Sequence, residues 1–142
     1  CDMFGDDLGG RHSFPTPSQI LDGSDRICEC RLGFREQRFI ELAQRVEDGE
    51  VDVDAIAELD YQGCVDELMG IKGVGPKVAD CVALFAYGHL DAFPVDARIQ
   101  KSMEELYGVS GSYKAVSAYG REKFGRYAGY AQEFLYHRKF IG

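Results

Sequence analysis

The sequence predicts an all-α protein, and three observations lead to this fold class. Apolar residues recur with helical period along most of the chain. No convincing run of five or more β-branched residues alternates as a half-buried strand would. Proline and glycine stand where such helices would begin and end. With 142 residues and 45% hydrophobic content, the chain can bury one well-packed core, so we expect a single helical domain over residues 1–142.

Capping and helix-breaking residues predict where each helix begins and ends. Thr16 followed by Pro17 is typical of a helix N-terminus, and Ser24 predicts a second cap. Gly49 closes a longer amphipathic helix. In chain order, the expected helices span residues 17–21, 24–31, 35–49, 53–59, 61–69, 76–87, 96–107, 113–124 and 127–139. The last two form a C-terminal segment over residues 112–139.

The charge is distributed unevenly along the chain, which bears on the partner. The net charge is −8, yet residues 1–95 hold 8 basic and 19 acidic residues, whereas residues 96–142 hold 8 basic and 5 acidic residues. A basic patch in the second segment could therefore face a polyanion although the whole chain is acidic. No apolar run is long enough to span a membrane and no signal peptide is recognisable. We expect a soluble intracellular protein, in the cytoplasm or nucleoid, or in the nucleus of a eukaryote.

The cysteines and the first residue of the chain add two expectations. Five cysteines form a sparse set, and Cys28 and Cys30 have no second Cys or His pair at a metal-ligand spacing. We therefore expect reduced thiols, with no metal required and no iron-sulfur cluster. The chain begins with Cys1 rather than Met, so we expect it to be a piece of a longer protein.

The stretch "GIKGVG" joins two expected helices and predicts a helix-hairpin-helix over about residues 61–88. It lacks the Gly-Lys-Ser/Thr ending of a Walker loop, and no strand precedes it as in a Rossmann loop. Gly73 and Gly75 permit a tight turn and a close approach to a partner. The N–H groups that begin the second helix would then bind a phosphate. A plain helix-turn-helix corner remains the alternative.

Lys77 and Asp96 are the candidate chemical groups. Lys77 lies in the first turn of the second hairpin helix, with Cys81 four residues later on the same face. A neutral amine there could attack carbon, although a phosphate contact or a solvated charge is the simpler reading. Asp96 ends a Gly/Pro-Asp loop over residues 88–96 and directly precedes a helix. It could be an N-cap, and it could also face a cation that develops at a sugar C1′.

Together, "LMGIKGVGPKVADC" and "FPVDARI" resemble the helix-hairpin-helix DNA glycosylases with a Gly/Pro-rich loop and a catalytic aspartate, most closely the 8-oxoguanine DNA glycosylases. The resemblance implies an orthogonal helical domain that acts as a monomer on double-stranded DNA. It implies removal of 8-oxoguanine and strand cleavage by β-elimination, with Lys77 forming a Schiff base and Asp96 as its electrostatic and proton-handling partner. The missing cysteine quartet favours this branch over endonuclease III. The family's N-terminal domain has no counterpart here, so the isolated chain would lack part of the base pocket.

The same resemblance implies roles for further residues. Gln132 would meet the Watson–Crick edge of the base and Tyr136 would stack on its face, although the two could simply pack on a helix. Phe34 would be a wedge into the stack, or alternatively a core residue. The implied base pocket is Cys81, Gln132 and Tyr136, and the implied DNA-binding residues are Phe34, Arg35, Lys72, Gly73, Val74, Gly75 and Arg98. Relatives also imply a hairpin cation held by the main-chain carbonyls of Met69, Ile71 and Val74.

Two other functions stay open. A non-catalytic helix-hairpin-helix DNA-binding fragment would need only the hairpin and the basic C-terminal segment. A glycosylase or lyase for a different damaged base, such as a pyrimidine, would differ only at the base pocket.

Overall fold

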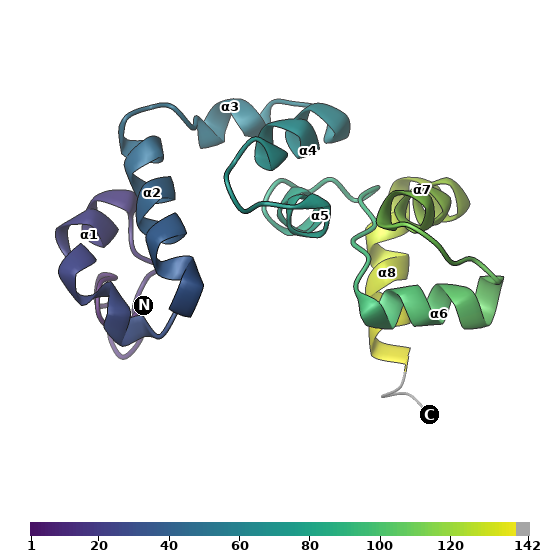
Figure 1. The fold of residues 1–142 in the computed structure, drawn as a ribbon, viewed down its shortest axis with the longest axis horizontal. Helices are drawn as coiled ribbons and strands as arrows, with labels where there is room; N and C mark the ends of the chain where they lie inside the picture. The colour runs from purple at the N-terminus through teal and green to yellow at the C-terminus, as the bar shows by residue number, and fades with distance from the viewer. Residues whose placement is uncertain (139–142) are drawn as a thin grey trace. The chain divides into compact units, whose positions relative to one another are not determined.

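A computed structural model describes residues 1–138, and these residues form helices joined by short loops (Figure 1). Within that range the strand pairing is limited to an isolated bridge between Asp7 and His12, so the all-α prediction is confirmed. The chain divides into two compact units, Cys1–Ala55 and Ile56–Gly142, and each is described by itself. The expectation of one domain stays a prediction. No helix in the described part of the chain is long and apolar enough to cross a membrane.

The first unit is built around two packed helices. Its elements are α1 (Pro17–Asp22), the 3-10 helices η1 (Ser24–Cys30) and η2 (Gly33–Arg35), and α2 (Glu36–Glu47), and α3 (Val53–Ala57) spans its boundary with the second unit. The helix α1 begins as predicted at Pro17, after the N-cap Thr16. The Thr16 hydroxyl accepts from the Gln19 N–H at 3.3 Å, and the Gln19 side chain accepts from the Thr16 N–H at 2.9 Å. This reciprocal capping box fixes the first turn. The unit closes over a small core of Ile20, Ile27 and Ala43.

The prediction of an α-helix capped by Ser24 is wrong. Residues 24–30 form a 3-10 helix whose N-cap is Gly23, and no side chain caps it. Gly23 also ends α1, so a single residue separates the two elements and none remains to act as a separate cap. The segment ends where Arg31 adopts a left-handed conformation with φ 55°.

The second unit consists of a helical hairpin followed by three further helices (Figure 1). The elements are α4 (Tyr61–Met69), α5 (Pro76–Phe85), α6 (Ala97–Tyr107), α7 (Tyr113–Phe124), the 3-10 turn η3 (Gly125–Tyr127) and α8 (Ala128–His137). Its core is formed by Phe93, Val95, Ile99, Met103, Val116 and Ala128. Gly120 lets α7 approach this core closely, because a Cβ there would lie 2.4 Å from the Phe93 ring.

Several helix ends differ from the predicted ones. Residues 61–69 and 113–124 match the prediction, whereas α3 and α5 each end two residues early. After Phe85 the α-helical pattern of α5 stops, because the Tyr87 N–H bonds to the carbonyl of Val82, five residues earlier, at 3.3 Å. Gly88 then turns the chain with φ 74°. The last helix begins at Ala128 because η3 precedes it, and it ends at His137. The predicted end at Lys139 lies outside the described residues.

Candidate active site

A cavity of about 190 Å³ in the second unit brings the predicted chemical groups together. Three segments form its wall: the face of α5, the loop that leads into α6, and the face of α8. Its lining residues are Lys77, Cys81, Phe85, Pro94, Asp96, Gln132, Glu133 and Tyr136. Lys77 and Asp96 therefore open onto one space, as does the whole base pocket that the sequence implied.

Lys77 projects from the first turn of α5 because of how that helix begins. Gly75 is the N-cap, Pro76 occupies the first helical position, and no side chain caps the helix. The Lys77 side chain is exposed, and Cys81 and Phe85 follow at intervals of four residues on the same face. Lys77 thus stands at the open end of an otherwise apolar stripe.

The Cys81 thiol is half-buried in the cavity wall, and the Lys77 side chain lies close enough to change its pKa. Burial raises the pKa of the Cys81 thiol above its ordinary value. Lys77 opposes this change, both as a nearby positive charge and as a hydrogen-bond partner of the sulfur. The nearby carboxylate charges of Asp80 and Asp96 raise the thiol pKa further. The thiol is therefore held in its neutral form beside the lysine.

Asp96 serves as the N-cap of α6 while it lines the cavity. Its Oδ1 accepts from the Arg98 N–H at 2.9 Å and from the Ile99 N–H at 2.8 Å. The preceding residues Pro94 and Val95 are buried, so the backbone that carries Asp96 is fixed on both sides. The cap predicted for Asp96 is confirmed, and both cap bonds use one oxygen, which leaves Oδ2 outside the cap.

Gln132 lines the cavity from α8 and is only 6% exposed. Its Oε1 has no hydrogen-bond partner among residues 1–138. Buried amide oxygens are nearly always paired in proteins, so an orphaned one beside a cavity indicates a ligand that would complete it. Gly129 brings α8 close enough for this: its N–H donates to the Leu90 carbonyl at 2.8 Å, and a Cβ there would lie 2.4 Å from Leu84.

Tyr136 follows Gln132 by one turn of α8 and is half-buried. Its side chain packs on the helix and also lines the cavity. The Arg98 guanidinium lies 5.0 Å from the centre of its ring. This cation–π contact holds the ring in one orientation. Arg98 itself is exposed on the first turn of α6.

The hairpin turn needs one glycine for its backbone rather than two. Gly73 adopts φ 93°, and the Val74 N–H bonds to the Ile71 carbonyl at 3.0 Å to close the turn. Gly75 has an ordinary φ of −102°, so the expectation that both glycines make the turn is wrong for Gly75. A Cβ on Gly75 would meet nothing within 4 Å. Lys72 and Gly73 are exposed, and Val74 is half-buried.

The predicted hairpin cation, with its carbonyl ligands Met69, Ile71 and Val74, stays a prediction. Within the described part of the chain, no group of three or more His, Cys, Asp or Glu residues could hold a metal ion. The thiols of Cys1, Cys28, Cys30, Cys64 and Cys81 are free.

Phe34 and Arg35 belong to the first unit and are described apart from the cavity. Phe34 is 74% exposed, so the alternative that it is a core residue is wrong. The Arg35 guanidinium lies 4.5 Å from the centre of the Phe34 ring. The two side chains therefore form an exposed aromatic and cationic pair on η2.

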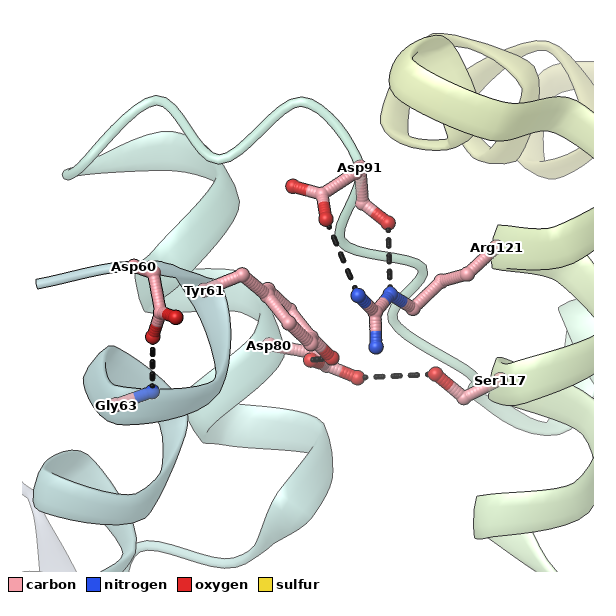
Figure 2. A network of polar contacts seen from close by, with 7 residues as sticks. All are labelled: Asp60, Tyr61, Gly63, Asp80, Asp91, Ser117 and Arg121. Atoms are coloured by element: carbon pink, nitrogen blue, oxygen red, sulfur yellow. Dashed lines mark hydrogen bonds and ion pairs between the residues drawn. The ribbon is translucent and has the colours of Figure 1, made fainter.

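Sequence reasoning missed two features of the second unit. Phe85 and Glu133 line the cavity, and the spacing of Phe85 from Cys81 could have indicated the first. Asp80 is buried in the hairpin and accepts hydrogen bonds from side chains of α4 and α7 (Figure 2). An acidic residue within the apolar stretch "KVADCVALF" was the available signal.

Comparison with known proteins shows the family to which the chain belongs. No family model matches the sequence. The probable N-glycosylase/DNA lyase of Methanothermobacter thermautotrophicus is 32% identical, over 88% of this chain and 46% of that protein. The N-glycosylase/DNA lyase of Saccharomyces cerevisiae is 26% identical, over 92% of this chain and 44% of that protein. The chain thus spans a little under half the length of these two relatives.

A solved structure agrees with these relatives. The Clostridium acetobutylicum 8-oxoguanine glycosylase/lyase, in complex with double-stranded DNA containing cytosine opposite 8-oxoguanine, has a TM-score of 0.88 and 34% identity, over 99% of this chain and 51% of that one. The chain belongs to the helix-hairpin-helix DNA glycosylase superfamily. Within it, the chain is similar to the 8-oxoguanine glycosylase/lyases.

Proposed function

We propose that this chain is the helical part of a bifunctional base-excision repair enzyme. It would remove 8-oxoguanine from duplex DNA and cleave the resulting abasic strand. One observation carries the proposal: Lys77, Asp96 and the unpartnered amide oxygen of Gln132 share one cavity. Such a cavity offers a nucleophile, a fixed carboxylate and a polar group for a flipped base.

In the proposed reaction Lys77 is the nucleophile. Its neutral Nζ forms a bond to C1′ of the damaged nucleotide while the bond from C1′ to the base nitrogen breaks, and the departing base takes up a proton. The bound nitrogen then loses a proton, the ring oxygen leaves C1′ with a proton, and a Schiff base results. Removal of a proton from C2′ expels the 3′ phosphate by β-elimination. Asp96 stabilises the positive charge at C1′ and handles these protons.

The base would be recognised by residues of α5 and α8. Gln132 would complete its unpartnered Oε1 by accepting a hydrogen bond from the Watson–Crick edge. Tyr136 would stack on one face of the base, and Cys81 would line the opposite side of the pocket. On the first unit, Phe34 would fill the space that the flipped base leaves, and Arg35 would contact the cytosine opposite.

The hairpin would bind the DNA backbone without reading sequence. The free N–H groups in the first turn of α5 have no side-chain cap, and the helix dipole adds partial positive charge there. The side chains of Lys72 and Arg98 would contact phosphates. Gly73 and Gly75 would let the hairpin backbone come close to the DNA, and Val74 between them would contribute its main chain. Affinity should fall steeply with salt, because bound phosphates release counterions.

The relatives support this proposal within limits that their lengths set. Both relatives are named for glycosylase and lyase activities, and the chain spans a little under half the length of each. We therefore propose that the full activity belongs to a longer protein, as the sequence led us to expect. We further propose that it acts as an intracellular monomer without a cofactor.

Borohydride trapping tests the proposal. The chain is incubated with two duplexes, one with 8-oxoguanine opposite cytosine and one with an abasic site, and the imine is reduced to a stable covalent complex. We expect trapping on the abasic duplex, because Schiff-base formation there needs no base removal. Lys77→Ala should abolish trapping, whereas Lys101→Ala, which removes an exposed lysine on α6, should retain it.

Each outcome discriminates between the candidate functions. Trapping by Lys77→Ala at the wild-type level would mean that another amine is the nucleophile. Binding to both duplexes without any trapping would favour a non-catalytic DNA-binding fragment. Faster action on an oxidised pyrimidine than on 8-oxoguanine would move the substrate to a different damaged base.

A further inference from the structure

A network of polar side chains that is buried at its centre joins the hairpin to α7 (Figure 2). Its centre is Asp80, which is 2% exposed and lies one residue before Cys81 and three after Lys77. We call it the Asp80 network, and its members are Tyr61, Asp80, Asp91, Tyr113, Ser117 and Arg121. All of them belong to the second unit.

Three hydroxyl groups converge on the Asp80 carboxylate. The Tyr61 hydroxyl donates to Oδ1 at 2.5 Å, the Tyr113 hydroxyl makes a short bond to Oδ2, and the Ser117 hydroxyl donates to Oδ2 at 3.3 Å. A buried carboxylate costs several kcal/mol in lost solvation and is tolerated only when its oxygens are hydrogen-bonded. The three donors must therefore keep their positions relative to α5, which makes the arrangement rigid.

The two tyrosines remain donors over a wide pH range. Burial, and then the hydrogen bond to Asp80, raise the pKa of Tyr61 and of Tyr113 above the ordinary value of 10.0. The Tyr113 hydroxyl also lies 3.3 Å from the carbonyl oxygen of Pro76, the residue just before Lys77. One hydroxyl proton cannot serve both acceptors, and the shorter contact to Asp80 takes it. Tyr113 thus contacts α5 on both sides of Lys77.

The same face of α7 also holds the loop that leads to Asp96. Arg121 donates from Nε to the Asp91 carbonyl at 3.2 Å and from a terminal nitrogen to the Asp91 carboxylate at 3.1 Å. Its guanidinium lies 3.6 Å from the centre of the Tyr61 ring. Tyr113, Ser117 and Arg121 are spaced by four residues, so they form one stripe along α7. That stripe holds α5 at one end and the loop at the other.

We propose that Asp80 is a positioning residue that fixes Lys77 and Cys81 relative to Asp96 through α7. The proposal rests on the proposed function, because it assigns no chemistry to Asp80 itself. The Asp80 network sets the geometry in which the amine and the carboxylate meet at one sugar carbon. Misplacement by about 1 Å costs on the order of 100-fold in rate, so a loosened network should slow catalysis with little effect on DNA binding.

The first measurement is the single-turnover rate of borohydride trapping on the abasic duplex, made beside the duplex dissociation constant. Asp80→Asn and Tyr113→Phe should each slow trapping by about 10- to 100-fold and change the dissociation constant less than about twofold. The double variant should cost little more than either single one, because both act through one network. Asp66→Asn, an exposed change on α4, is the matched control. A rate unchanged in both network variants would overturn the proposal.

The second measurement needs no activity and so separates this proposal from the proposed function. The iodoacetamide labelling rates of Cys81 and of the fully buried Cys64 are compared in one molecule, at a temperature well below unfolding. Tyr113→Phe leaves the Asp80 charge in place, so a several-fold faster labelling of Cys81 alone would report a loosened α5. Tyr119→Phe on the same helix should match wild type. Equal acceleration of both thiols, or no change at Cys81, would overturn the proposal even if trapping succeeds.

Discussion

Lys77 and Asp96 line the same cavity although nineteen positions separate them in the chain. The hairpin presents Lys77 at the start of α5, and a loop whose residues 92–95 are buried returns the chain so that Asp96 caps α6 beside it. The cap fixes one carboxylate oxygen and leaves the other outside the cap. Structural and chemical roles are therefore combined in one side chain, and they can be separated by choice of substitution.

Asp96→Asn should separate these two roles. Asparagine is as good an N-cap as aspartate, so the free energy of unfolding should change by less than about 1 kcal/mol. The rate of base release should fall by about 100- to 1,000-fold, because the amide carries no charge to stabilise a cation at C1′. Urea unfolding and single-turnover release from the 8-oxoguanine duplex measure the two effects. Asp96→Ala should also lose about 1 kcal/mol of stability. Base release at the wild-type rate in Asp96→Asn would mean that Asp96 acts only as the N-cap of α6.

Gln132→Met should improve or preserve stability while it harms recognition. The substitution replaces a buried amide that has no partner for its Oε1 by an apolar chain of similar shape, so no desolvated oxygen remains unpaired. The free energy of unfolding should stay equal or rise by up to about 1 kcal/mol. The value of kcat/KM for the 8-oxoguanine duplex should fall by about 10-fold or more, because the Watson–Crick edge of the base loses its partner. A clear loss of stability would mean that Gln132 is paired within the protein.

The sequence predicted several of the residues that line the cavity, and their chemical roles stay predictions. Lys77, Cys81 and Asp96 could be placed together because helical spacing and a single loop relate them. Gln132 and Tyr136 came from the family resemblance, and no local pattern could show that α8 returns to α5. That return depends on Gly129, whose missing side chain makes room for Leu84.

The differences in the fold have equally local causes. The helix expected from Ser24 is a 3-10 helix that follows α1 after the single residue Gly23, and the local sequence pattern does not show that the two elements share this residue as a cap. Asp80 escaped notice because its partners come from other helices. Hydrogen bonds between distant segments have no signature in a single sequence, whereas caps and periodic stripes do.

The reactivity of Cys81 should depend on Lys77. Burial raises the pKa of the Cys81 thiol and Lys77 lowers it, so Lys77→Ala should raise that pKa further. Less thiolate would then exist at any pH below the thiol pKa, and alkylation of Cys81 should become slower. Peptide mass spectrometry across a pH series measures the change, with Lys72→Ala as the matched control. Equal midpoints in wild type and Lys77→Ala would show that the lysine does not act on the thiol.

Alkaline pH should destabilise the protein through Tyr61 and Tyr113. Both pKa values are raised in the folded state above the ordinary value of 10.0, first by burial and then by the hydrogen bond to Asp80. Below pH 10 both hydroxyls keep their protons in either state and the contribution to stability is complete. Above it the unfolded chain loses these protons first, so the free energy of unfolding falls as pH rises. Urea titrations at several alkaline pH values measure the slope.

The double variant Tyr61→Phe/Tyr113→Phe provides the decisive comparison for this slope. Without the two hydroxyls the free energy of unfolding should fall less steeply with pH, although it starts lower because Asp80 has lost two donors. Tyr130→Phe removes an exposed hydroxyl and is the matched reference. If the double variant declines as steeply as wild type, then other groups govern the alkaline transition. In that case the raised pKa values of Tyr61 and Tyr113 would not account for the loss of stability at alkaline pH.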